Sequence, residues 1–148
     1  MDKEKEELLK KWLDKAGDDL RVAKYLSTMH HPTPDEIICF HCQQSAEKYL
    51  KAFIFYNDIE PEKTHDLEYL LELCQKYNKG FSILSTKADL LNRYGIMPRY
   101  PNELQITEQD MKNAISNAKV IEEFVLNIFE EQKKQQTENH ECEIKQSP

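Results

Sequence analysis

The segment from Phe40 to Ile54, FHCQQSAEKYLKAFI, combines an apolar helical face with side chains that can bind or react. Gln44, Glu47 and Lys48 could line a cleft between helices, where an amide, a carboxylate and an ammonium group would hold the polar parts of a ligand. The same stripe is also typical of a core helix whose charged face meets solvent. Periodicity alone favours the solvated face.

Cys39, His41 and Cys42 have the side chains of a metal site within four residues. A structural zinc site needs four ligands, and the sequence offers no second CxxC and no HxxxH. A redox CxxC would follow a strand, and no strand pattern precedes this one. We therefore expect no metal and no cofactor, and expect the two cysteines to pack inside a helix.

Thr64, His65 and Asp66 stand at the start of a predicted helix. Thr64 or Asp66 can cap that helix through its side-chain oxygen. His65 could serve as a general acid or base, because imidazole can both donate and accept a proton. A histidine beside a cap is more often a surface residue, so both interpretations stay open.

Residues 95–102, GIMPRYPN, cannot form regular helix, because they hold one glycine and two prolines. Arg93 precedes this loop and Arg99 lies within it, and guanidinium groups suit phosphate. Tyr94 and Tyr100 could stack on a base. Alternatively, Arg99 pairs with a carboxylate while Tyr100 packs under the loop. The predicted ligand-binding residues are Gln44, Lys48, Arg93, Arg99 and Tyr100.

The composition limits what such a site can be. The net charge of -7 disfavours sequence-independent nucleic-acid binding, so a phosphate contact needs a local basic patch. Three glycines cannot build a glycine-rich phosphate loop. Neither a signal peptide nor an apolar stretch long enough for a membrane span is visible. We expect a cytoplasmic protein with no membrane contact, whose four cysteines are thiols.

Apolar residues recur at three- and four-residue steps, which predicts helices. The predicted fold is an all-α, up-and-down antiparallel four-helix bundle with an extra short helical piece. The main helices are predicted at about residues 2–28, 35–56, 64–77 and 107–131, and the extra piece at 81–94. Residues 1–131 would form one domain, and the polar residues 132–148 a disordered tail.

Three aromatic residues give the second predicted helix more aromatic surface than one core stripe needs. They are Tyr49, Phe53 and Tyr56. Surplus aromatic surface often marks a protein interface. This pattern favours a homodimer.

The order of these features resembles the HEPN domain, a helical nucleotide-binding family. The resemblance covers residues 8–130 and rests on a few separated pieces. These are Trp12, Ala16, Asp19–Leu20 and Ala23, then Phe40–Ala52, then Lys63–Leu67, then Arg99–Pro101, and finally Ala114 and Ala118. The resemblance implies a four-helix bundle, often a homodimer, and often a nucleotidyltransferase partner in a toxin–antitoxin-like pair.

Several HEPN branches are metal-independent ribonucleases with an arginine followed, after four to six residues, by a histidine. This sequence departs from that pattern, because no histidine follows Arg93 or Arg99 in range, and the first after Arg21 is His30. Loss of the general acid or base lowers the rate of RNA cleavage roughly 10²–10⁴-fold. The favoured hypothesis is a binding module without the usual nuclease motif, which binds a nucleotide or nucleic-acid phosphate, a nucleotidyltransferase partner, or both. The alternatives are a divergent ribonuclease using His41 or His65, and an interaction subunit that docks a nucleotidyltransferase.

Overall fold

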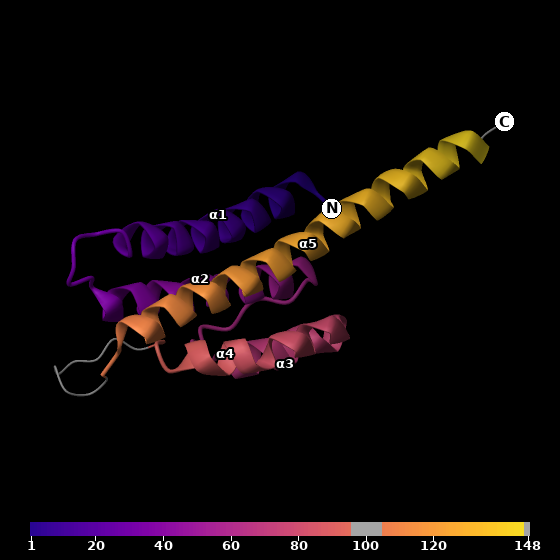
Figure 1. Cartoon of the computed structure of the whole chain (residues 1–148). Helices are drawn as coiled ribbons and strands as arrows, with labels where there is room; N and C mark the ends of the chain where they lie inside the picture. The colour runs from indigo at the N-terminus through magenta and orange to yellow at the C-terminus, as the bar shows by residue number, and fades with distance from the viewer. Residues whose placement is uncertain (96–104, 147–148) are drawn as a thin grey trace.

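The computed structural model describes residues 1–95 and 105–146, and all regular secondary structure in them is helical (Figure 1). The elements are α1 (Lys3–Leu26), α2 (Asp35–Tyr56), α3 (Leu67–Tyr77), the 3-10 helix η1 (Lys79–Leu84), α4 (Ser85–Asn92) and α5 (Glu108–Gln146). The predicted all-α class is therefore confirmed, and α2 begins and ends at the predicted residues. None of these helices is both long and apolar enough to cross a membrane.

The core is built around α2, which packs against α1, α3, α4 and α5. Figure 1 shows α1 on one side of α2, with α3 and α4 on the other. The fully buried ring of Phe53 lies 4.5 Å from that of Phe81 and 6.5 Å from that of Phe129, measured between centroids. These contacts join α2, η1 and α5 in one hydrophobic cluster.

The helices α1 and α2 are antiparallel, as their short connection predicts. Lys5 Nζ donates to the carbonyl oxygen of Tyr56 at 2.8 Å, so the start of α1 lies beside the end of α2. Ser45 Oγ donates to the carbonyl oxygen of Ala16 at 2.7 Å, which satisfies a buried hydroxyl between the two helices.

One detail differs from the predicted up-and-down order: α3 runs in the same direction as α2. The segment 57–66 returns along α2, so His65 lies beside Gln43 and Cys74 lies beside Leu50. Antiparallel packing was expected because short connections join neighbouring ends. Here the ten-residue connection is long enough to run back along its own helix.

The aromatic residues of α2 fill the core of the molecule. Tyr49 is 2% exposed and Phe53 is 1% exposed. The Tyr49 hydroxyl donates to Glu122 Oε2 at 2.6 Å, and the half-buried Tyr56 ring packs edge-on against Phe129. The interpretation of these aromatic residues as an interface is therefore wrong. The homodimer remains a prediction, which now rests on the family resemblance.

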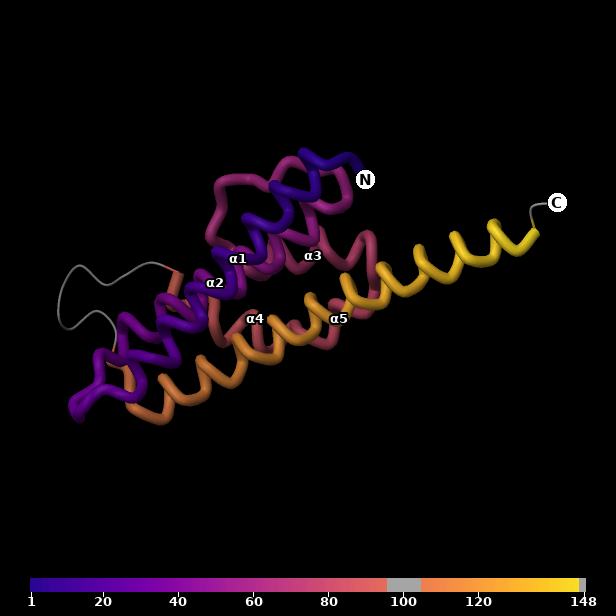
Figure 2. The backbone as a smooth tube through the Cα atoms, turned by 90° about the horizontal axis from the view of Figure 1, so that it is seen from above, coloured from indigo at the N-terminus to yellow at the C-terminus, as the bar shows by residue number. Residues whose placement is uncertain are grey.

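The last helix is longer than the sequence predicts. The predicted end near Glu131 does not match α5, which continues to Gln146. Of the tail 132–148 that was predicted to be disordered, residues 132–146 are therefore helical, and residues 147 and 148 lie outside the described residues. Residues 132–146 contain no glycine or proline and many good helix formers, so nothing interrupts the helix. Every residue from Lys133 to Gln146 is exposed, and Figures 1 and 2 show this part projecting beyond the other helices.

Three of the four cysteines are expected to resist modification in the native protein. Burial raises the pKa of the Cys39 and Cys74 thiols to about 12 and also raises the pKa of Cys42, whereas Cys142 is exposed. At pH 8 a thiol of pKa 12 is thiolate for only about 10⁻⁴ of the time, and the thiolate is the reactive species. Titration with a disulfide reagent should therefore label one thiol natively and four in denaturant. Rapid native labelling of two or more would contradict the structure.

Candidate functional site

The polar side chains of α2 form two adjacent rows along the helix. The inner row is buried and comprises Gln43 (0% exposed), Glu47 (4%) and Lys51 (7%). The outer row is partly exposed and comprises His41, Gln44 and Lys48. Interpreting this whole stripe as a solvated face is therefore wrong, because its inner row is covered by the chain itself.

In the inner row, Glu47 joins His65 to Lys51. Its Oε1 lies 2.6 Å from Nδ1 of His65, and its Oε2 lies 3.3 Å from Nζ of Lys51. The side chains of Glu47 and Lys51 are 5% and 8% exposed, while that of His65 is 61% exposed. A buried carboxylate needs such partners on both oxygens. The cluster holds the imidazole of His65 at the surface through Nδ1. The other ring nitrogen, Nε2, is not the atom that bonds to Glu47.

The backbone of His65 is held by the same helix. Gln43 Nε2 donates to the carbonyl oxygen of His65 at 2.9 Å, and Gln44 Nε2 donates to Gln43 Oε1 at 2.7 Å. A methyl group added at Gly95 would lie 3.2 Å from Gln43 Nε2, so the backbone there packs closely on this amide. The predicted loop after α4 thus starts beside the group that holds His65.

The start of α3 fixes His65 from the other side. Asp66 caps α3, since its Oδ1 accepts a hydrogen bond from the backbone amide of Glu68 at 3.1 Å. Asn92, at the end of α4, accepts from the amide of Leu67 at 2.8 Å and donates to Asp66 Oδ1 at 3.2 Å. His65 is therefore positioned by α2, α3 and α4 together.

The outer row repeats the pattern with a carboxylate of α1. Asp19 Oδ1 lies 3.0 Å from Nδ1 of His41, and Asp19 Oδ2 accepts a hydrogen bond from Nζ of Lys48. The three side chains are 28%, 14% and 25% exposed in the order His41, Asp19, Lys48. The predicted phosphate ligand Lys48 is thus already paired with a carboxylate between two helices.

Arg93, at the end of α4, is also engaged. Its guanidinium lies 4.8 Å from the centroid of the Tyr94 ring, donates to the Tyr94 hydroxyl at 2.6 Å, and comes within 3.5 Å of Asp110. The hydrogen bond to Tyr94 raises the pKa of Arg93 further. Hydrogen bonds from Thr107 lower the pKa of Asp110, which remains a carboxylate. Tyr94 is 5% exposed, so its predicted stacking on a base is wrong.

The structure places Lys48 and Arg93 in different ion pairs. Lys48 pairs with Asp19 of α1, whereas Arg93 comes within 3.5 Å of Asp110 of α5. Each of the two predicted phosphate-binding cations is therefore engaged by a carboxylate of a different helix.

Arg99 and Tyr100 belong to residues 96–104, which lie outside the described residues. Within residues 1–95 and 105–146, no cluster of three or more histidine, cysteine, aspartate or glutamate side chains could hold a metal ion.

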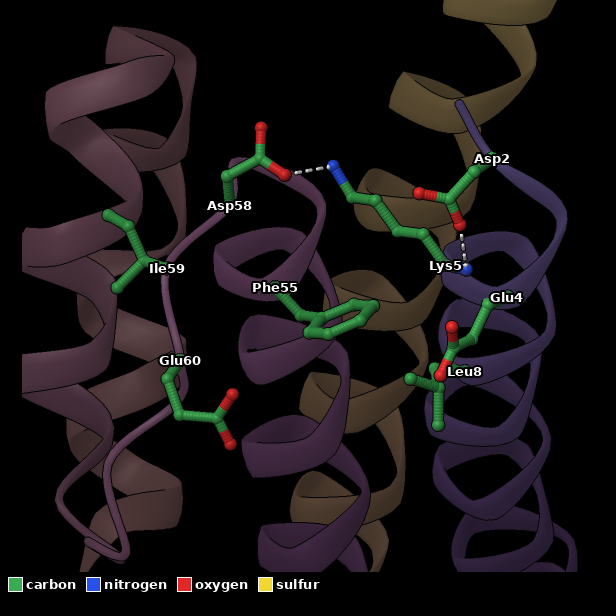
Figure 3. A pocket seen from close by; sticks show the side chains of 8 residues that line it. All are labelled: Asp2, Glu4, Lys5, Leu8, Phe55, Asp58, Ile59 and Glu60. Carbon is green, nitrogen blue, oxygen red and sulfur yellow. Dashed lines mark hydrogen bonds and ion pairs between the residues drawn. The ribbon is translucent and has the colours of Figure 1, made fainter.

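A cavity of about 290 Å³ at the start of α1 is chemically unlike a phosphate site (Figure 3). Lys5 crosses it to Asp58 at 2.6 Å, so its one cation is already paired. Figure 3 shows Glu4 and Glu60 on opposite sides of the Phe55 ring, and Leu8 and Ile59 add apolar side chains to the lining. Glu4 and Glu60 form no ion pair with the part of the chain that the structure describes, and such carboxylates repel a phosphate. We therefore exclude this cavity as the nucleotide site.

Sequence reasoning missed the partners of both histidines. Asp19 appeared only as a residue of the family resemblance, and Lys51 only within the segment Phe40–Ala52. The available signal was the buried side of α2: Gln43, Glu47 and Lys51 recur every four residues among apolar neighbours. Charged side chains at such positions require partners from elsewhere in the chain.

Comparisons with known proteins give one family and two similar solved structures. The family model described as the HEPN domain matches residues 9–132. The crystal structure of TT1696 from Thermus thermophilus is similar with a TM-score of 0.65 and 24% identity, covering 80% of this chain and 96% of that one. The structure of ST0689, described as an archaeal HEPN homologue, is similar with a TM-score of 0.62 and 25% identity, covering 80% and 95%. No curated protein sequence matches the chain significantly.

Proposed function

Because this chain belongs to the HEPN domain family, we propose that it is a binding module that contacts the phosphate of a nucleotide or RNA through His65. The observation that supports this function is the exposed imidazole held by the buried Glu47. With Nδ1 directed at the carboxylate, Nε2 can donate a charge-assisted hydrogen bond to a phosphate oxygen when the ring is protonated. Because the ring is already ordered, binding costs less conformational entropy.

Local charge is compatible with this role. The paired charges of Glu47 and Lys51 compensate each other, so the buried carboxylate presents little repulsion to an anion. Arg99 and Tyr100 stay the proposed second phosphate contact and the proposed base contact, because they follow Gly95 in the sequence. Gln44, Lys48 and Arg93 would take part only in binding a longer strand, since carboxylates of two different helices hold Lys48 and Arg93.

Thermal-shift titration with nucleotides and short RNAs tests the proposal. A ligand at 100 times its dissociation constant stabilises the fold by about 2.7 kcal/mol. We expect a saturable shift in the wild type and in the control variant His30→Ala, whose side chain is exposed. We expect at least tenfold weaker binding in His65→Ala. This loss corresponds to about 1.4 kcal/mol of binding free energy, as expected when one charged contact is removed. An unchanged dissociation constant in His65→Ala would refute the assignment.

The same geometry supports a second candidate, a divergent metal-independent ribonuclease. A carboxylate on Nδ1 fixes the tautomer in which neutral Nε2 can accept a proton, as a general base must. This candidate requires RNA cleavage by pure protein in the presence of a chelator, lost in His65→Ala and retained in His30→Ala. If the pure protein binds RNA without cleaving it, the ribonuclease is excluded and the binding module remains as the candidate function.

The family also suggests protein partners, which we propose on resemblance alone. A nucleotidyltransferase-type protein in a toxin–antitoxin-like pair would dock on the helical surface, and the module itself would be a homodimer. Co-expression with such a partner should give a stable complex on gel filtration. No response to any nucleotide together with a stable complex would favour an interaction subunit over a nucleotide-binding module.

A further inference from the structure

The C-terminal part of α5, Gln132–Gln146, is a helix without a partner in its own chain. We call it the extension. It lies beyond residue 132, where the match to the family model ends. All of its side chains after Gln132 are exposed. An isolated helix shorter than about 12–15 residues is marginal in water, so the extension gains from packing against another surface.

An apolar cavity lies at the root of the extension. Its volume is about 420 Å³, and it opens between α1, the end of α2 and α5. Its walls include Leu9, Leu13, Tyr56, Phe129, Gln132 and Gln136. An apolar side chain that entered this cavity would be removed from water and would gain packing contacts.

The side chain suited to the cavity is on the extension itself. Ile144 is 61% exposed and is the one large aliphatic residue after Phe129 in the described part of α5. Phe129, Lys133, Gln136, His140 and Ile144 are spaced by three or four residues, so all lie on one helix face. The cavity and Ile144 thus share a face but are separated along the helix, and Ile144 cannot fill the cavity of its own chain.

We propose that two copies of this chain dock through their extensions, antiparallel, about a two-fold axis near residue 138. Positions equally far from residue 138 then face each other. Ile144 of the partner subunit lies opposite Gln132 and enters the cavity, and the reverse contact follows by symmetry. His140 of the partner subunit lies opposite Gln136.

The charges of the extension fit this register. Lys133 lies opposite Glu143 of the partner subunit. The two-fold axis makes this pair occur twice. Both side chains are exposed in the single chain, so they are available for pairing.

This docking is independent of the proposed function at His65. The extension begins at the far end of α5 from the segment that joins it to α4, and His65 lies beside the end of α4 (Figure 1). A variant that breaks the dimer should therefore leave the thermal shift with nucleotides unchanged, and His65→Ala should leave the dimer intact. Failure of one idea is thus separable from failure of the other.

Sedimentation equilibrium of the full chain over a concentration series tests the docking. The wild type should reach twice the monomer mass of 17.5 kDa. Ile144→Asp should weaken the dimer about a hundredfold or more, because two buried isoleucines are lost. Ile83→Asp is the matched control, because Ile83 is 73% exposed on η1 and should leave the dimer intact. A monomer at every concentration would overturn the proposal, as would a dimer equally stable in both variants.

A charge exchange tests the antiparallel register. Lys133→Glu and Glu143→Lys should each weaken the dimer about tenfold, because two ion pairs become like-charge contacts. The double variant Lys133→Glu/Glu143→Lys should recover most of the lost affinity, since the pairs are restored with reversed charge. Additive losses in the double variant would overturn the register and with it the proposal.

Discussion

Glu47→Leu is expected to lower the free energy of unfolding by about 3–5 kcal/mol, because it leaves the ammonium of Lys51 buried without its carboxylate. The Lys51 side chain is 8% exposed, and Glu47 Oε2 is its hydrogen-bond partner within the described residues. His65 would lose its anchor in the same variant. Urea denaturation followed by circular dichroism measures this change as a lower midpoint at constant slope.

A double variant separates the lost charge pair from the lost packing. Glu47→Leu/Lys51→Met replaces the ion pair by apolar side chains of similar size, and such replacements are often neutral or stabilising. We expect the double variant to be more stable than Glu47→Leu. The exposed control Glu123→Leu should change stability by less than about 0.5 kcal/mol. A loss below about 1 kcal/mol in Glu47→Leu would show that Lys51 is not committed to this pair.

Phe53→Ala is expected to cost about 3–5 kcal/mol through the cavity it creates. Phe53 is 1% exposed and packs against Phe81 and Phe129. At about 2–4 °C per kcal/mol for a chain of this size, the melting temperature should fall by roughly 6–20 °C. Differential scanning calorimetry measures this fall directly.

The control for this core substitution is Tyr25→Ala. Tyr25 is 75% exposed on α1, so its removal should change stability by less than about 0.5 kcal/mol. Equal destabilisation of the Phe53 and Tyr25 variants would contradict the placement of the aromatic cluster. A small effect of Phe53→Ala would instead fit the sequence-based interpretation of this residue as part of an interface.

Local patterns in the sequence were sufficient for most of the helices. Pro32 and Pro34 lie between the first two predicted helices, and α2 then begins at Asp35, as the apolar periodicity predicts. At the start of α5, Thr107 and Asp110 cap each other's backbone amides at 3.0 Å, which is a capping box with aspartate in place of glutamate. Both signals are local, so neither required knowledge of tertiary contacts.

The candidate site depends on contacts that no local pattern encodes. Glu47 contacts His65 because the segment 57–66 turns back along α2. The composition of this segment does not predict its direction. Asp19 meets His41 and Lys48 only after α1 and α2 have packed. The continuation of α5 beyond Glu131 was missed because polarity was taken to indicate disorder, although a polar helix without breakers can persist.

The central claim is that His65, held by Glu47, contacts a ligand phosphate. Long-range proton–nitrogen NMR of the five histidine side chains, recorded while short RNAs and nucleotides are added, tests it most directly. We predict that the Nε2 resonance of His65 moves saturably while that of His30 stays in place, and that the response is absent in Glu47→Gln. No movement of His65 at ligand concentrations that stabilise the fold would contradict the claim and place the binding site elsewhere.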